Sequence, residues 1–193
     1  MKARLYFNTM KIFSSCEILR TSYSFTYLFG EFAVQGTVSD FFEICKLFES
    51  AADYYRTKGI KQWNQGYDLE KIYYNIIQKE TFIIKSGNGV LLCTFAISEK
   101  LPDYYPEYLK TETNIWIVKS LCTKLQELTC PGKKVIKKII QAAIDNHISK
   151  IYLDCVIDNP SLEKYYERFG FERIVIVKHP KYCQDMVVMV LGV

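Results

Sequence analysis

The sequence predicts a mixed α/β domain, in which a mostly antiparallel sheet of six to seven strands carries helices on both faces. Three observations support this fold class. Residues 32–193 contain several apolar runs of strand length, rich in β-branched side chains. Segments with apolar residues at every third or fourth position, typical of amphipathic helices, alternate with these runs. The turn Gly87-Asn88-Gly89 joins two of the runs, which indicates antiparallel pairing.

The elements follow from periodicity and from local stop signals. Strands are predicted at 32–38, on both sides of the turn within 81–98, and at 114–123, 150–157, 172–178 and 186–193. Helices are predicted at 39–59, 67–80, 132–146 and 161–169, and the polar segment 99–113 is predicted to be a loop. Asp40 and Glu43 have the spacing of a capping box, Asp68 is a candidate N-cap, and Gly59 and Gly170 are candidate helix stops.

The length of 193 residues suits one domain with an appendage. Residues 1–31 are aromatic and Ser-rich without a clear period, so they are interpreted as an N-terminal extension of unknown role. Residues 32–193 are interpreted as the folded domain.

Composition excludes several classes. Hydrophobic residues make up 49% of the chain and aromatic residues 15%, which predicts a packed core and excludes a disordered protein. A net charge of +4 is too small to indicate a nucleic-acid partner, although it suits an anionic small ligand. The seven cysteines have no metal-ligand spacing, so reduced thiols and no metal site are predicted.

No run reaches the ~18 apolar residues that a membrane span requires. We therefore expect a cytoplasmic protein without a membrane partner. The sequence is compatible with a monomer or a homodimer.

The most informative stretch is "YLDCVIDNPSLEKYYERFGFERIVIV", residues 152–177, which places an Asn-Pro, two adjacent tyrosines and a Gly-Phe between two strand-like runs. It resembles the fifth strand and fourth helix of the GCN5-related N-acetyltransferase (GNAT) superfamily. The order of elements is similar to that family from about Phe32 to the C-terminus, and "GIKQWNQGYD" is similar to a segment of some small bacterial members. The resemblance implies a sheet in which strands four and five splay apart.

The same resemblance assigns roles to individual residues. It implies that the pantetheine arm of acetyl-CoA pairs with the backbone of Leu121, Cys122 and Thr123, and that Asn159 hydrogen-bonds the arm. It also implies that Tyr166 is the general acid toward the departing thiolate. The structural alternatives are that Tyr166 packs on the sheet and that Asn159 only caps a helix, and adjacent tyrosines cannot share one helix face.

The pyrophosphate-binding turn of the family, Gln/Arg-x-x-Gly-x-Gly/Ala, is altered in "TCPGKKVIKKII". With the helix periods in register, Pro131 falls on the Gln/Arg, Lys134 on the first Gly and Ile136 on the Gly/Ala. An anion at this helix start would relieve the repulsion between the lysines and the helix dipole; the alternative is a solvated basic face. The candidate cofactor-binding residues here are Gly132, Lys133, Lys134, Val135, Ile136 and Lys137.

A general base is less evident, because the strand 114–123 contains Lys119 and no carboxylate. Glu112 and Asp154 are the candidates. Trp63 and Tyr67 are predicted to line an acceptor pocket, with core packing as the alternative. Aromatic residues in the loop 99–113 (Tyr104, Tyr105 and Tyr108) and the isolated His179 are further candidates for this region.

These observations predict an enzyme that transfers an acetyl group from acetyl-CoA to a primary amine of a small molecule or peptide by direct attack. The alternative is a catalytically inactive binding or regulatory module on the same scaffold, because a fold does not fix a function. Acetyl-CoA binding discriminates between an active enzyme and a module that has lost the cofactor.

Overall fold

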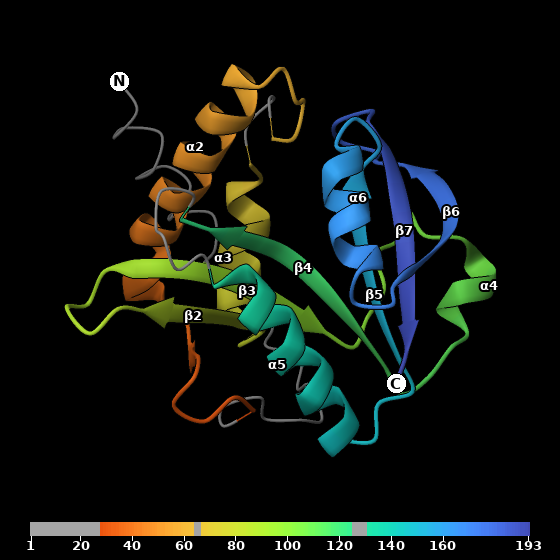
Figure 1. Cartoon of the computed structure of the whole chain (residues 1–193), viewed down its shortest axis with the longest axis horizontal. Helices are drawn as coiled ribbons and strands as arrows, with labels where there is room; N and C mark the ends of the chain where they lie inside the picture. The colour runs from red at the N-terminus through yellow and green to blue at the C-terminus, as the bar shows by residue number, and fades with distance from the viewer. Residues whose placement is uncertain (1–27, 64–66, 125–130) are drawn as a thin grey trace.

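The structure is a computed structural model that describes residues 28–63, 67–124 and 131–193. Most of the expected N-terminal extension therefore lies outside the described residues. The strands are β1 (Val34–Gln35), β2 (Thr81–Lys85), β3 (Leu91–Ser98), β4 (Ile115–Thr123), β5 (Lys150–Val156), β6 (Glu172–Lys178) and β7 (Asp185–Gly192). The helices are the 3-10 helix η2 (Val38–Asp40), α2 (Phe41–Thr57), α3 (Leu69–Ile77), α4 (Glu107–Lys110), α5 (Gly132–Asp145) and α6 (Pro160–Glu167) (Figure 1).

The strands form one seven-stranded sheet in the order β1-β2-β3-β4-β5-β7-β6. The central pair β4–β5 is parallel, and every other neighbouring pair is antiparallel. The predicted fold class is therefore confirmed, as is the predicted order of the main elements.

Helices cover both faces of this sheet (Figure 1). Successive residues of a strand point to opposite faces, and the core is divided accordingly. Phe82 packs in the cluster that includes residues of α5 and α6, whereas its neighbour Ile83 packs with α2 and α3. A third cluster places Ile117 of β4 against Tyr105 of the loop that contains α4.

The first predicted strand is much shorter than expected. Thr37 donates its backbone N–H to Asp40 Oδ2 at 2.9 Å, which begins a 3-10 turn and ends the strand at residue 35. Asp40 was predicted to pair with Glu43 in a capping box, but it closes this box with Thr37 instead and bonds Lys85 at 2.8 Å. The predicted cap at Asp68 is confirmed by its bond from Lys71 N at 3.2 Å.

Residues before position 32 also belong to the folded domain. The ring of Phe29 meets Phe82 and Phe95 edge-on, at centroid distances of 4.9 and 5.3 Å, in the core. Aromatic rings in this geometry contribute more than their buried area alone. The domain therefore reaches at least to Leu28, and the boundary predicted from periodicity lies too late.

The parallel pair β4–β5 separates partway along its length. The ladder joins residues 115–118 to residues 150–153, whereas β4 continues to Thr123 and β5 to Val156. A β-bulge accompanies the separation: Ser120 and Leu121 both lie opposite Phe95 of β3, and Ser120 has a φ of 54°. Beyond the ladder, no strand among the described residues pairs with the edge of β4 that faces β5.

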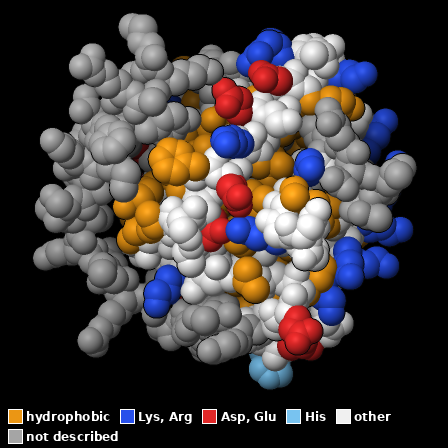
Figure 2. Space-filling model, turned by 90° about the vertical axis from the view of Figure 1, so that its left-hand side faces the viewer, with side chains coloured by type: hydrophobic (Ala, Val, Ile, Leu, Met, Phe, Trp, Pro, Cys, Tyr) orange, Lys and Arg blue, Asp and Glu red, His pale blue; other side chains and the backbone are white. Residues whose placement is uncertain are grey.

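The surface mixes both signs of charge. On the face turned to the viewer in Figure 2, basic and acidic side chains are interspersed with apolar ones. In the described part of the chain, no helix is both long and apolar enough to cross a membrane. Within the same residues, no three His, Cys, Asp or Glu side chains gather into a metal-binding group.

Candidate functional site

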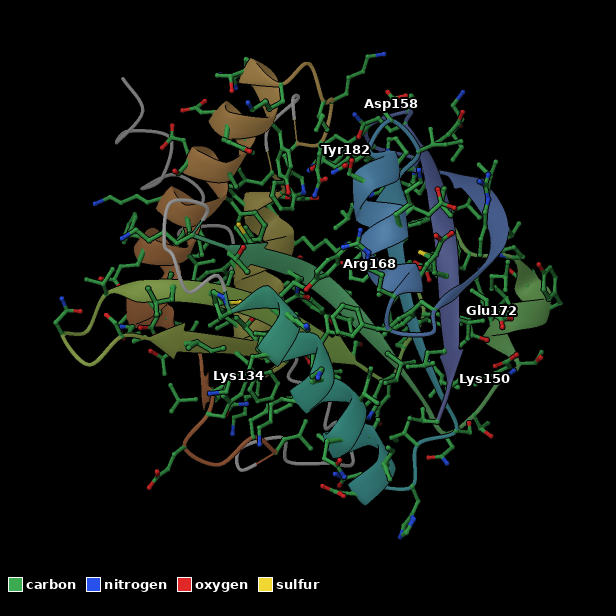
Figure 3. All side chains as sticks on the ribbon, viewed as in Figure 1. Lys134, Lys150, Asp158, Arg168, Glu172 and Tyr182 are labelled. Atoms are coloured by element: carbon green, nitrogen blue, oxygen red, sulfur yellow. The ribbon has the colours of Figure 1, made fainter. Side chains whose placement is uncertain are left out.

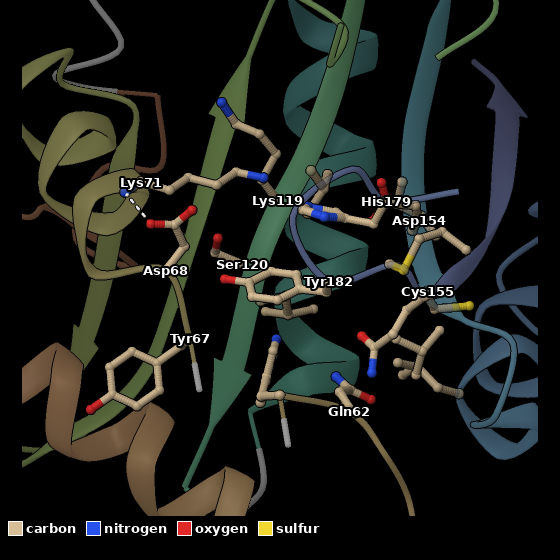
Figure 4. Close-up of a pocket in the computed structure, with 18 of the residues that line it drawn as sticks. Gln62, Tyr67, Asp68, Lys71, Lys119, Ser120, Asp154, Cys155, His179 and Tyr182 are labelled. Carbon is tan, nitrogen blue, oxygen red and sulfur yellow. Dashed lines mark hydrogen bonds between the residues drawn. The ribbon is translucent and has the colours of Figure 1, made fainter. Parts of the chain in front are cut away.

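Two pockets meet where β4 and β5 separate. We call the first the helix pocket, because it lies at the start of α5, and the second the loop pocket, because it includes the β6–β7 loop. The helix pocket is lined by Ala51, Tyr55, Gln62, Trp63, Leu121, Cys122, Thr123, Gly132, Lys133, Leu162, Tyr165 and Tyr166. The loop pocket shares Gln62, Trp63, Leu121, Leu162 and Tyr166 with it, and adds, among others, Tyr67, Asp68, Lys71, Tyr104, Lys119, Ser120, Asp154, Cys155, His179 and Tyr182 (Figure 4).

Five of the residues predicted from the sequence to bind the cofactor line the helix pocket. They come from the end of β4 beyond its ladder with β5 and from the first turn of α5, and are Leu121, Cys122, Thr123, Gly132 and Lys133. The first helical hydrogen bond runs from Val135 N to Pro131 O at 2.8 Å. The amides of residues 132–134 therefore have no acceptor within the helix, and a helix start of this kind favours an anion.

The other four candidates on α5 lie outside both pockets. Val135 and Ile136 are 0% and 1% exposed in the core, which removes their side chains from any ligand. Lys134 lies over the ring of Phe32 at 5.2 Å from its centroid, and Lys137 is exposed. Figure 3 shows Lys134 on α5, well separated from Tyr182 of the loop pocket. The predicted start of this helix at Gly132 is confirmed. Of the six candidates on it, only Gly132 and Lys133 line the helix pocket.

Tyr166 lies at the junction of the two pockets. It is 5% exposed, and burial raises the pKa of its phenol well above the ordinary value, so the phenol keeps its proton at neutral pH. The adjacent Tyr165 lines only the helix pocket. The two neighbours thus have different surroundings, as their positions on the helix require.

Asn159 has a different environment from the one predicted. It is 3% exposed, lines neither pocket, and caps α6 by accepting from Leu162 N at 3.3 Å. Its Nδ2 donates to Gln62 Oε1 at 2.7 Å. These bonds indicate that Asn159 positions Gln62, which lines both pockets, and they do not support direct contact with the pantetheine arm.

Aromatic side chains form one wall of the loop pocket. Trp63 and Tyr67, the predicted acceptor residues, both line it and pack against Phe48, at centroid distances of 5.0 and 5.6 Å. Both alternatives weighed for these residues therefore hold: each packs against core aromatics and also borders the cavity.

Lys119 of β4 also borders the loop pocket, but neighbouring polar side chains compensate its charge. Its Nζ lies 2.8 Å from Glu80 Oε2 and 3.4 Å from Asn75 Oδ1. Burial lowers the pKa of Lys119, against the raising effect of Glu80. Glu80 precedes β2 in the chain, so sequence spacing gave no indication of this pairing.

Of the two candidate bases, only Asp154 lies in the site. Its Oδ2 accepts from the hydroxyls of Tyr104 at 2.6 Å and Tyr105 at 3.1 Å, and burial is the main cause that raises the pKa of both phenols. Glu112 bonds Lys150 and Tyr152 at 2.7 and 2.6 Å and lines neither pocket. The candidacy of Glu112 is therefore wrong.

The β6–β7 loop closes the loop pocket with two stacked rings. His179 lies 4.7 Å from Tyr182 and 4.9 Å from Tyr104, centroid to centroid. Burial lowers the pKa of His179, and the charge of Lys71 lowers it further, so its imidazole is neutral near pH 7. Sequence reasoning found His179 only as an isolated residue and missed Tyr182, because the loop carries no period.

Comparison with known proteins agrees with this architecture. The sequence model of the Acetyltransferase (GNAT) family matches residues 132–171, which include α5, β5 and α6. No curated protein matches the sequence. Similar solved structures include a GNAT-family acetyltransferase from Listeria monocytogenes 4b F2365 (19% identity, TM-score 0.67, 83% of this chain and 94% of that chain). Another is a GNAT-family acetyltransferase from Streptococcus agalactiae 2603 (15% identity, TM-score 0.66, 83% of this chain and 94% of that chain). A third is the ribosomal-protein-S18-alanine N-acetyltransferase from Escherichia coli (12% identity, TM-score 0.59, 83% of this chain and 92% of that chain).

The splayed parallel pair and the pocket at a helix start are features that the resemblance to this family implies, and the family match covers the elements that form them from α5 to α6. The family model over residues 132–171 supports the resemblance predicted from residues 152–177, and the similar solved structures show that the fold is shared.

Proposed function

We propose that this protein transfers the acetyl group of acetyl-CoA directly to a primary amine of a small molecule or peptide, with Tyr166 as general acid. The observation that carries the proposal is the position of Tyr166, a proton-bearing phenol where two pockets meet at the split between β4 and β5. One pocket suits the cofactor and the other the acceptor.

The cofactor binds in the helix pocket. The amides of the pantetheine arm pair with the edge of β4 at residues 119–123, beyond its ladder with β5, as an added strand would. The pyrophosphate lies against the amides of residues 132–134, with the ammonium group of Lys133 beside it. This arrangement needs only one glycine at the helix start, Gly132, and tolerates the loss of the family's other turn residues.

The acceptor amine enters through the loop pocket and meets the thioester at the junction. Asp154 takes the proton of the amine as its nitrogen attacks the carbonyl carbon. The backbone amides of β4 near the bulge at Ser120 offer donors for the charge that develops on the carbonyl oxygen. When the C–S bond breaks, the phenol of Tyr166 protonates the thiolate, and the proton held by Asp154 replaces the one that Tyr166 lost.

Neither cysteine that borders the reaction centre is suited to a covalent intermediate. Burial raises the pKa of Cys155 to about 12 and that of Cys122 well above the ordinary value. A thiol in this state is a poor nucleophile at neutral pH. Direct transfer within a complex of both substrates is therefore the favoured route, and positioning of the two reactants supplies much of the rate enhancement.

The test combines acetyl-CoA titration with release of free thiol during turnover of an amine panel. We expect Tyr166→Phe to bind acetyl-CoA as the wild type does and to lower kcat by about 100-fold or more, because it removes only the acidic proton. Tyr74→Phe, at an exposed tyrosine outside both pockets, is the matched control. Binding without turnover of any amine would favour the inactive binding module instead.

A further inference from the structure

The loop pocket contains charged side chains of both signs. They differ in whether an ion pair compensates their charge. Asp68 is compensated by Lys181, whose Nζ lies 2.9 Å from Asp68 Oδ2. Lys119 is compensated by Glu80 at 2.8 Å. These two ion pairs belong to the walls of the pocket, and each leaves little net charge for a ligand.

Lys71 of α3 is different. It lines the loop pocket, and within the described residues no acidic side chain forms an ion pair with its ammonium group. Lys119 and His179 line the same pocket as Lys71, and its positive charge contributes to the lowered pKa of both, after the larger effect of burial. Asp68 lies near Lys71, but its carboxylate forms its ion pair with Lys181. An ammonium group that has no ion pair of its own in a pocket favours an anionic ligand.

Asp154 provides the opposite charge across the pocket. Its hydrogen-bond partners in the described residues are two neutral phenols, so no cation cancels its charge. Figure 4 shows Lys71 entering the pocket from α3 and Asp154 from β5, on opposite sides. Asp154 and Tyr166 both line this pocket, and the charge of Asp154 is a minor contribution to the raised pKa of the phenol, after burial. The amine must therefore lie toward Asp154, and Lys71 lies farther along the acceptor.

We propose that the acceptor is an amine that also carries a carboxylate, as a free amino acid does, and that Lys71 binds the carboxylate while the amine lies between Asp154 and Tyr166. This inference rests on the proposed acetyl transfer and names the acceptor class for the same site. The pocket volume of about 140 Å³ suits a small acceptor or the end of a peptide. Lys71 is a specificity residue here, because it contacts a part of the acceptor that does not react.

The test compares free amino acids with their carboxamides, which keep the shape of the acceptor and remove its negative charge. We expect the wild type to prefer the carboxylates, and Lys71→Met to raise their KM on the order of 10- to 100-fold, the range for a hydrogen bond to a charged group. The KM of the carboxamides and the affinity for acetyl-CoA stay unchanged. Lys71→Arg restores part of the preference, and Lys46→Met, at an exposed lysine of α2 outside both pockets, leaves it intact.

A second measurement does not depend on turnover. Titration of the CoA-loaded protein with N-acetylglycine and N-acetylglycinamide is expected to show tighter binding of the carboxylate, and Lys71→Met is expected to abolish the difference. Equal affinity for the two probes, or turnover of amines that shows no carboxylate preference, would overturn the assignment of the acceptor while leaving acetyl transfer intact. If the wild-type protein does not bind acetyl-CoA, the proposed function itself is refuted. Selective use of peptides ending in a carboxylate would identify the same chemistry on a larger acceptor.

Discussion

The side chain of Asn159 donates a hydrogen bond to Gln62 across 2.7 Å, and both residues are buried although 97 positions separate them in the chain. This bond connects the start of α6 to the segment that follows α2. Because α6 carries Tyr166 and Gln62 lines both pockets, the bond sets the distance between the two walls of the site. Its loss should therefore affect both stability and cofactor binding.

The first prediction separates the two bonds of Asn159. Asn159→Ala removes the cap of α6 and leaves Gln62 without its donor, so we expect a loss of about 1–3 kcal/mol in the free energy of unfolding and weaker acetyl-CoA binding. Asn159→Asp keeps an acceptor for Leu162 N but places a carboxylate oxygen opposite Gln62 Oε1. Urea denaturation and titration with acetyl-CoA measure both effects. If Asn159→Asp binds acetyl-CoA as well as the wild type, the bond to Gln62 has no part in shaping the site.

The second prediction concerns the buried pair Lys119–Glu80, whose side chains are 14% and 9% exposed. Removing one member leaves the other charge buried without its partner, so Glu80→Leu is expected to lower the free energy of unfolding by about 3–5 kcal/mol. The double variant Glu80→Leu/Lys119→Leu should recover much of this loss, because both charges are then absent. A double-mutant cycle measured by urea denaturation tests the coupling. Additive losses would show that the two charges act independently.

The third prediction follows from His179. Its folded-state pKa is lowered by burial first and by Lys71 second, so the unfolded chain takes up the proton at a higher pH than the folded protein does. The contribution to stability is therefore fully present above the unfolded pKa of about 6.5 and is lost as the pH falls through the folded-state pKa. Wild type is expected to lose more stability than His179→Gln between pH 7.5 and pH 5. Parallel pH dependence of the two urea midpoints would contradict this account.

The sequence predicted the sheet and the main helices because those elements depend on local periodicity. The apolar run of β2 and the 3.6-residue period of α5 are visible in the chain itself. The short strand β1 was overestimated because the competing bond between Thr37 and Asp40 is a side-chain effect that apolar patterning does not register. The short helix α4 lies in a segment too short to show a period.

The site was predictable only where a motif marks it. Tyr166, Leu121 and Gly132 were found through the family pattern, and all three line the helix pocket. Lys71 and Tyr182 were missed, because three elements distant in the chain bring the loop pocket together and no spacing connects them. Val135 and Ile136 were selected through the motif register, which does not reveal that the core buries both side chains.

The central claim is that acetyl-CoA occupies the gap between β4 and β5, and hydrogen–deuterium exchange with and without acetyl-CoA tests it most directly. The account predicts slower amide exchange at residues 119–123, where the pantetheine arm pairs with β4, and at residues 132–134, where the pyrophosphate meets the start of α5. The edge strand β6 serves as the internal control and should be unaffected. Saturating acetyl-CoA that leaves both segments unprotected, or protects a different surface, would contradict the account.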